Sequence, residues 1–271
     1  IQQAVAQKAD VPTSSFLRIG VDARGIAMGE AQGAATEDVY AVYWNPAGLA
    51  KVLLKEVAFT RQNMFQGLHY HFLGYAHPTR SYGTLAAQLF VLTSGDITTT
   101  LENPDGSFGW LGEVFSVRDV GFGLSQGKAL TQNASYGFSV KLISHTIADE
   151  SALALAIDGG VLYQTRMEPL RIGVAVQNLS TRYTFISQRL HEPSTLKFAA
   201  LYTLFDRPQF LAADLNLVSG QRNTLNLGAE YWYRDVIAFR SGIKLPPSGL
   251  LSSFAMGIGV NWRDAYQLDY S

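Results

Sequence analysis

The strongest constraint on the fold of this chain is a two-residue alternation of apolar and polar side chains that recurs along most of its length. The stretch A-S-Y-G-F-S-V-K-L begins at Ala134, and its apolar residues are Ala134, Tyr136, Phe138, Val140 and Leu142. Because successive side chains of a β-strand point to opposite faces, this stretch has one apolar face and one polar face. About a dozen such segments, each roughly ten residues long and separated by turns, are typical of a closed antiparallel sheet.

The length and rhythm of these segments predict a transmembrane barrel, in which apolar side chains face lipid and polar side chains face the lumen. The further segments lie at 57–60, 68–72, 82–92, 97–101, 120–124, 153–163, 170–177, 196–204, 211–217, 225–233, 237–244, 254–262 and 266–270. Together they make about fourteen strands, an even number of the kind that bacterial barrels usually have. The predicted fold class is therefore all-β, a transmembrane antiparallel β-barrel.

The composition agrees with a membrane barrel and excludes several other classes. Charged residues make up 16% of the chain and apolar residues 47%, whereas an ordinary soluble domain has roughly 25% charged residues. The chain contains no apolar run of the about 18 residues that a membrane-spanning helix requires. A net charge of −1 gives no electrostatic footprint for nucleic acid. The absence of cysteine rules out disulfides and thiolate metal sites.

The ends and the least regular stretches of the chain carry further expectations. The polar start I-Q-Q-A-V-A-Q-K-A-D is what an exported chain shows once its signal peptide has been removed. The stretches 93–112 and 180–193 have the longest interruptions of the alternation and are predicted to be extracellular loops. The last strand stops part-way, at Tyr270 and Ser271. Processing, an incomplete sequence and closure by a partner's strand are the open explanations for that end.

Residues 16–50 differ from the rest because they are rich in Ala and Gly and lack a sustained alternation. This pattern predicts short helices and turns rather than strands. Within Ala41–Ala50 we expect a short helix that begins near Asn45 and Pro46. Asparagine is a preferred N-cap residue and proline is favoured at the first helical position.

The same stretch, F-L-R-I-G-V-D-A-R-G-I-A-M-G-E-A followed by W-N-P-A-G-L, resembles the PorV/PorQ branch of the FadL-like outer-membrane proteins. The matching positions are Phe16, Leu17, Asp22, Ala23, Arg24, Met28, Gly29, Ala31, Trp44, Asn45, Pro46 and Ala47. The resemblance implies a barrel of the bacterial outer membrane, with residues 1–50 as a plug in the lumen and residues 51–271 as the wall. It also implies a non-enzymatic accessory of type IX secretion or cell-surface assembly that works through a protein partner.

The wider FadL-like family includes channels for hydrophobic molecules. The alternative function is therefore a passive channel for hydrophobic small molecules, with a hydrophobic ligand in the lumen and membrane lipid around the wall. A soluble β-propeller or sandwich adhesin is a third alternative, but the roughly 40- to 50-residue repeat that a propeller needs is not found. The chain is short for the secretion branch, so we expect reduced cargo-contacting loops.

The plug motif supplies the candidate site residues. Asp22 and Arg24 are predicted to latch the plug to charged residues of the lumen, because buried charges need partners. The Asn45–Pro46 pair is predicted to be a turn that directs the chain into the first strand. The full predicted set is Asp22, Arg24, Met28, Trp44, Asn45 and Pro46 on the plug, with Arg171, Glu230, Arg240 and Lys244 as lumen partners.

No enzymatic or metal-binding constellation emerges from the sequence. His69 and His71 lie two residues apart, a spacing that can ligate a metal, but no third ligand is identifiable. We therefore predict polar, lumen-facing histidines, with the apolar Leu68, Tyr70 and Phe72 on the opposite face. A phosphate loop and a dinucleotide fingerprint are both missing. The chain is predicted to be a non-enzyme without metal or cofactor.

Overall fold

The computed structural model describes residues 11–12, 16–102, 107–167, 169–185, 188–204, 209–246, 253–263 and 265–271. Most of the first fifteen residues, and the centres of the two predicted loops at 93–112 and 180–193, lie outside the described residues. In the described part of the chain, no helix is long and apolar enough to cross a membrane.

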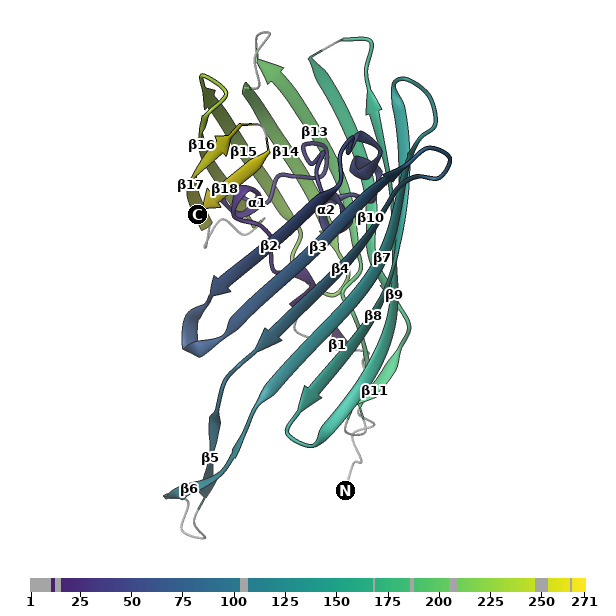
Figure 1. The fold of residues 1–271 in the computed structure, drawn as a ribbon. Coiled ribbons are helices and arrows are strands. Elements are labelled where there is room, and N and C mark those ends of the chain that lie inside the picture. The colour runs from purple at the N-terminus through teal and green to yellow at the C-terminus, as the bar shows by residue number, and fades with distance from the viewer. Residues whose placement is uncertain are drawn as a thin grey trace.

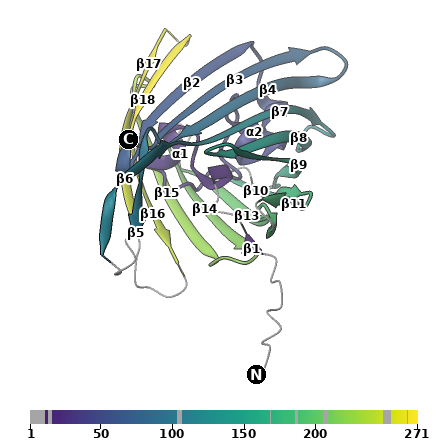
Figure 2. The same ribbon diagram turned by 90° about the horizontal axis from the view of Figure 1, so that it is seen from below.

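A single sheet of thirteen described strands curves around the interior as a wall (Figures 1 and 2). Every neighbouring pair in it is antiparallel. In spatial order the strands are β18 (Tyr266–Tyr270), β17 (Ser253–Trp262), β16 (Ile237–Leu245), β15 (Thr224–Tyr233), β14 (Gln209–Val218), β13 (Thr195–Leu204), β10 (Leu170–Ser180), β9 (Glu150–Gln164), β8 (Ala134–Ile147), β7 (Val117–Ala129), β4 (Gly83–Thr93), β3 (His69–Thr79) and β2 (Glu56–Asn63). The predicted all-β antiparallel barrel fold is confirmed. Within the described residues, the edge strands β2 and β18 form no ladder with each other.

Two smaller sheets interrupt the wall at one end. The connection from β4 to β7 contains the hairpin of β5 (Ile97–Glu102) and β6 (Phe108–Phe115). The connection from β10 to β13 contains β11 (Tyr183–Phe185) and β12 (Gln188–His191), and β12 also pairs in parallel with β1 (Val11–Pro12). Figure 1 shows β5 and β6 at the lower end of the wall on one side, and β11 toward the same end on the other side. The stretches predicted as loops therefore carry short strands of their own.

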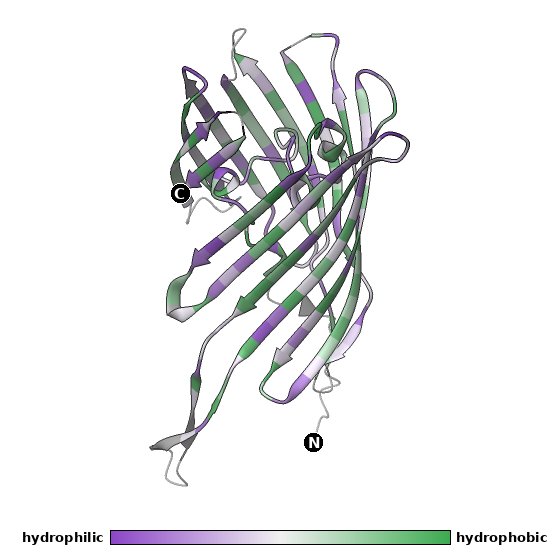
Figure 3. Ribbon diagram, in the orientation of Figure 1, coloured by the Kyte–Doolittle hydropathy of each residue, from purple (hydrophilic) through white to green (hydrophobic). Residues whose placement is uncertain are grey.

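The alternation in the sequence separates an apolar outer face from an inner face. On β9, Leu153, Leu155 and Ile157 are half exposed, whereas Ala154 and Ala156 between them are buried. Figure 3 shows hydrophobic and hydrophilic residues alternating along the strands in this way. An outward apolar face is what a strand in contact with lipid requires.

Strand β3 departs from the predicted orientation. Tyr70 and Phe72 are fully buried and face inward, whereas His69 and His71 lie on the outer face, where His71 stacks on Phe59. The interior is apolar at this point because Tyr40 of the N-terminal region packs 5.4 Å from Phe72, measured between ring centroids. The prediction of lumen-facing histidines is therefore wrong.

Residues 16–52, here called the N-terminal segment, lie inside the curved sheet (Figure 2). The segment consists of short helices: η1 (Phe16–Arg18), α1 (Ala23–Ala27), α2 (Ala41–Trp44) and η2 (Pro46–Lys51). One further short helix, η3 (Phe65–Gly67), connects β2 to β3. The main apolar core lies between the segment and the wall, where Phe16, Val42 and Leu49 cluster with Tyr70 and Ile143.

Glycines of the wall allow the N-terminal segment to approach the strand backbones. A Cβ atom on Gly160 would collide with the Asn45 side chain, and one on Gly137 would collide with the backbone of Pro46. On the other side of the interior, a Cβ on Gly242 would meet the backbone of Met28. These positions have no room for a larger residue because the segment lies directly against the sheet.

Candidate functional site

On one side of the interior, buried ion pairs join the N-terminal segment to the wall. Arg24 on α1 donates from Nε to Oε2 of Glu230 on β15 at 2.8 Å. Glu230 also accepts from Arg240 on β16, and Arg240 Nη1 lies 2.5 Å from Asp269 Oδ1 on the edge strand β18. The side chains of Glu230 and Arg240 are fully buried. Because a buried charge is costly without a partner, each of these groups depends on the next one.

The other two wall residues that the sequence singled out also contact the N-terminal segment. Lys244 Nζ lies 2.5 Å from Glu30 Oε2, and Arg171 Nη2 lies 2.6 Å from Glu37 Oε1. All four predicted wall residues therefore form ion pairs. Lys244 and Arg171 pair with Glu30 and Glu37, however, and not with Asp22 as predicted. These pairs are partly exposed, so each stabilises less than a buried pair.

Asp22 has a different role from the predicted one. Its carboxylate accepts from the backbone N–H of Gly25 at 2.7 Å, as the N-cap of α1, and from Trp44 Nε1 at 2.7 Å. It thus joins two helices within the N-terminal segment instead of reaching the wall. Burial, aided by the nearby Asp38 carboxylate, raises the pKa of Asp22 to about 7, against the lowering effect of the Trp44 and Gly25 hydrogen bonds and of Arg24.

The remaining motif residues shape the turn between the helices. Asn45 is the N-cap of η2 as predicted, accepting from Ala47 N at 3.1 Å, with Pro46 at the first helical position. Its Nδ2 donates to the carbonyl of Gly33 at 2.8 Å. Met28 is fully buried and accepts from Gln32 through its sulfur. The motif is therefore an internal scaffold of the segment.

The wall contains a break in pairing at β10. The β10–β13 ladder stops at the pair Gln177 and Thr195, while the β9–β10 ladder shifts register after Val176 and resumes at Leu179. Asn178 between them has a left-handed backbone with φ of 58°. Asparagine adopts this conformation more readily than most residues, and a bulge of this kind re-aims a strand.

A buried polar network holds the bulge in place. The backbone N–H of Asn178 donates to Asp158 Oδ1 at 2.7 Å, and its side-chain oxygen accepts from Lys141 Nζ. Lys141 Nζ also lies 2.8 Å from Asp158 Oδ2. The network connects β8, β9 and β10, so the bulge is fixed by contacts within the wall.

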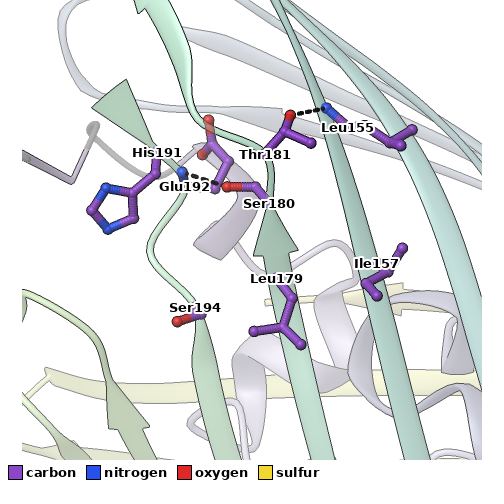
Figure 4. A pocket seen from close by; sticks show the side chains of 8 residues that line it. All are labelled: Leu155, Ile157, Leu179, Ser180, Thr181, His191, Glu192 and Ser194. Atoms are coloured by element: carbon purple, nitrogen blue, oxygen red, sulfur yellow. Dashed lines mark hydrogen bonds between the residues drawn. The ribbon is translucent and has the colours of Figure 1, made fainter. Parts of the chain in front are cut away.

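A cavity of about 380 Å³ opens at the bulge, where β10 and the chain before β13 separate. Figure 4 shows its lining. Leu155 and Ile157 come from β9, and Leu179, Ser180 and Thr181 come from the end of β10 and the residue after it. His191, Glu192 and Ser194 come from the end of β12 and the stretch that leads into β13. The three apolar residues are half exposed on the outer face of the wall, whereas Glu192 is buried. The cavity therefore connects the apolar outer surface with a buried carboxylate.

Behind the cavity, Glu192 belongs to a second buried cluster. His145 Nε2 lies 2.9 Å from Glu192 Oε1, and His145 Nδ1 lies 2.9 Å from Asp119 Oδ1. Tyr183 donates its hydroxyl to Glu192 Oε1 at 3.0 Å and stacks on the His145 ring. Both ring nitrogens face carboxylate oxygens, so the imidazole is held from both sides. The described residues contain no group of three or more residues suited to hold a metal ion.

Comparison with known proteins places the fold. No protein-family model matches the chain, and no curated protein matches its sequence. Among solved structures, the Pseudomonas putida toluene transporter TodX aligns with a TM-score of 0.69 and 13% identity, covering 96% of this chain and 92% of that one. The Ralstonia pickettii toluene transporter TbuX aligns at 0.65 and 14%, covering 92% of each chain. A Pseudomonas aeruginosa FadL homologue aligns at 0.60 and 13%, covering 96% of this chain and 89% of that one.

The chain has the FadL-type fold. At 13 or 14% identity this likeness establishes the fold alone. The predicted FadL-like resemblance is thus confirmed at the level of fold, while the finer resemblance to the PorV/PorQ branch stays a prediction.

Sequence reasoning missed the features of the FadL-type wall that surround the cavity. One available signal was the pair Gln177 and Asn178, two successive polar residues that break the alternation of β10 and mark a bulge. The Asp119, His145 and Glu192 cluster had no local signal, because its members come from β7, β8 and the segment before β13.

Proposed function

We propose that this chain is a passive, non-enzymatic channel for hydrophobic small molecules in the bacterial outer membrane. Residues 1–50 act as the plug and residues 51–271 as the wall. The observation that carries the proposal is the cavity at the β10 bulge, which places half-exposed Leu155, Ile157 and Leu179 at an opening of the wall. A small apolar molecule gains from burial against such side chains. The fold shared with two toluene transporters supports the same class of cargo.

The arrangement of the ends gives the proposed channel a direction. Outer-membrane barrels have short periplasmic turns and longer extracellular loops. The end with the β5–β6 hairpin and β11 carries the longer connections, so we assign it to the cell exterior. The cavity lies near this end, because Ser180 and Thr181 lie within three residues of the start of β11. Cargo would therefore meet the cavity early on its way inward.

The test is uptake of radiolabelled p-xylene by intact bacterial cells, whose lipopolysaccharide leaflet slows the entry of apolar molecules. Expression of the chain should raise the initial uptake rate several-fold over cells without it. The double variant Leu155→Trp/Leu179→Trp, which fills the cavity, should remove most of this gain. The matched variant Leu153→Trp/Leu215→Trp changes two outward leucines that do not line the cavity and should retain it. Equal uptake with and without the chain would refute the channel.

The secretion role implied by the sequence resemblance stays a prediction. The motif that suggests this role consists mainly of residues with a packing role. Its members Asp22, Met28, Trp44, Asn45 and Pro46 are all buried within the N-terminal segment or against the wall. Buried residues of this kind present no surface to a protein partner. The motif therefore supports the fold of the segment more directly than it supports a secretion activity.

A further inference from the structure

We propose that the cavity at the β10 bulge is a binding site for small amphiphiles that combine an apolar body with a hydrogen-bond-donating hydroxyl, such as phenols and alcohols. The inference deepens the proposed channel function and rests on it for its biological meaning. The binding itself is a separate property of the cavity.

The lining of the cavity has two chemically distinct parts. Leu155, Ile157 and Leu179 form an apolar side toward the outer face, and Glu192 with Ser180 forms a polar end toward the interior. Figure 4 shows the leucine and isoleucine side chains on β9 and β10, with Glu192 on the stretch between β12 and β13. The volume of about 380 Å³ is within the range of small-molecule sites. An elongated ligand with one polar end fits this division.

Glu192 identifies which polar group the ligand carries. Its Oε1 accepts from Tyr183 and contacts His145 Nε2, whereas its Oε2 is buried without a hydrogen-bond partner among the described residues. A buried polar atom left unpaired destabilises a protein. Because an ionised carboxylate only accepts hydrogen bonds, the missing partner must be a donor. A pure hydrocarbon would leave Oε2 unpaired.

The charge around Glu192 selects against an anionic head group. Two carboxylates, on Asp119 and Glu192, surround the single imidazole of His145 at 2.9 Å each. With His145 doubly protonated, this cluster still carries one net negative charge. A ligand carboxylate brought to Oε2 would meet that charge in a poorly screened environment. The site therefore favours a neutral hydroxyl over the carboxylate of a fatty acid.

The polar end is held rigid before any ligand binds. The backbone N–H of Glu192 donates to Ser180 Oγ at 2.9 Å, and Leu155 N donates to Thr181 Oγ1 at 3.1 Å. The Asn178 bulge is in turn fixed by Lys141 and Asp158. A carboxylate that does not need to reorient loses little on binding, so its hydrogen bond contributes fully to selectivity.

The first test compares ligands of equal shape on the wild-type chain in lipid nanodiscs, by equilibrium dialysis corrected for empty discs. p-Cresol and p-xylene differ only by a hydroxyl in place of a methyl group. p-Cresol should bind more tightly by about ten-fold, the effect of one hydrogen bond to a buried charged acceptor. p-Toluate, the anion, should bind no better than p-xylene. Equal binding of p-cresol and p-xylene would overturn the inference.

The second test inverts the donor requirement. Glu192→Gln places an amide N–H₂ where Oε2 lies, so the preference should shift from p-cresol toward 4′-methylacetophenone, which only accepts hydrogen bonds. Wild-type protein should prefer p-cresol. The Leu155→Trp/Leu179→Trp variant should lose both ligands, and the Leu153→Trp/Leu215→Trp control should keep the wild-type order. An unchanged order of ligands in a folded Glu192→Gln variant would contradict the inference.

These measurements separate the two proposals. Hydrocarbon uptake by cells together with equal p-cresol and p-xylene binding would leave the channel in place and remove the amphiphile site. Selective p-cresol binding without any uptake would support the site and remove the channel.

Discussion

The two sides of the interior use their buried charges differently. On the side of β14–β18, wall charges reach across to the N-terminal segment: Glu230 binds Arg24, and Lys244 binds Glu30. On the side of β7–β10, the buried charges Lys141 and Asp158 bind each other within the wall, and the partly exposed Arg171 at the start of β10 pairs with Glu37 of the segment. There the segment is held mainly by close packing, with Asn45 lying directly over Gly160.

This difference explains where an opening is tolerated. Ion pairs among β7–β10 secure the strands to each other, so β10 can leave β13 beyond Gln177 without releasing the wall. On the opposite side, Glu230 and Lys244 hold the segment in place, while Arg240 joins Glu230 to Asp269 within the wall. The buried ion pair that anchors the segment therefore lies at β15, whereas the cavity lies at β9 and β10.

The largest expected effect is the loss of the central carboxylate on the charged side. Glu230→Ala leaves Arg24 and Arg240 buried without their shared partner, and should cost about 3–5 kcal/mol of unfolding free energy. Urea unfolding in detergent measures this, with proteolysis of the N-terminal segment as a local readout. Glu150→Ala, at an exposed strand end, serves as the control and should stay within about 0.5 kcal/mol of wild type. Equal stability of the two variants would show that ion pairs do not anchor the segment.

The packed side has its own matched pair of variants. Gly160→Ala forces a methyl group into Asn45 and should cost about 1–3 kcal/mol, whereas neighbouring Gly159 has open space around it. Gly159→Ala should therefore be nearly neutral. Protease protection of the N-terminal segment is the measurement, and it should fall only in the Gly160 variant. Similar protection in both variants would mean that the segment lies farther from β9 than the structure indicates.

The bulge itself can be tested at Asn178. A Val at this position must adopt a left-handed backbone, which costs about 1–3 kcal/mol, and it also loses the side-chain contact with Lys141. Asn178→Gly keeps the backbone conformation but not the side-chain contact, so its loss of stability should be smaller. Thermal unfolding of both variants measures the difference. If Val and Gly behave alike, backbone strain does not define the bulge.

A further expected effect is a pH dependence of the N-terminal segment. The folded-state pKa of Asp22 is about 7, raised by burial from its ordinary value of 3.8. A raised carboxyl pKa means that stability is fully present below about pH 4 and is lost as pH rises through 7. One such group changes stability by at most about 1.4 kcal/mol per pH unit. Protease protection measured from pH 5 to pH 8 should fall, and Asp22→Asn should flatten that slope. A slope unchanged by the substitution would assign the effect to another group.

The sequence predicted which charged residues lie in the interior more reliably than it predicted their partners. Arg24, Glu230 and Arg240 do form one cluster, because charged residues in the interior of a membrane protein must find partners. Asp22 instead caps α1, a local hydrogen bond that the sequence D-A-R-G also allows. Asp214, which accepts from the backbone N–H groups of Gln32 and Gly33 and pairs with Lys197, escaped notice because lumen-facing polar residues are common on every strand.

The sequence by itself determined the strands, the alternation of their faces and the N-cap at Asn45, since these depend on neighbours within a few residues. Only the tertiary structure decided which face points inward, as β3 shows, because a period of two assigns residues to the same face without orienting it. It likewise decided the partners of Arg24 and Glu230, which are 206 residues apart, and the cavity at Asn178. Those features arise where distant segments meet, and the chain encodes their contacts only through the completed fold.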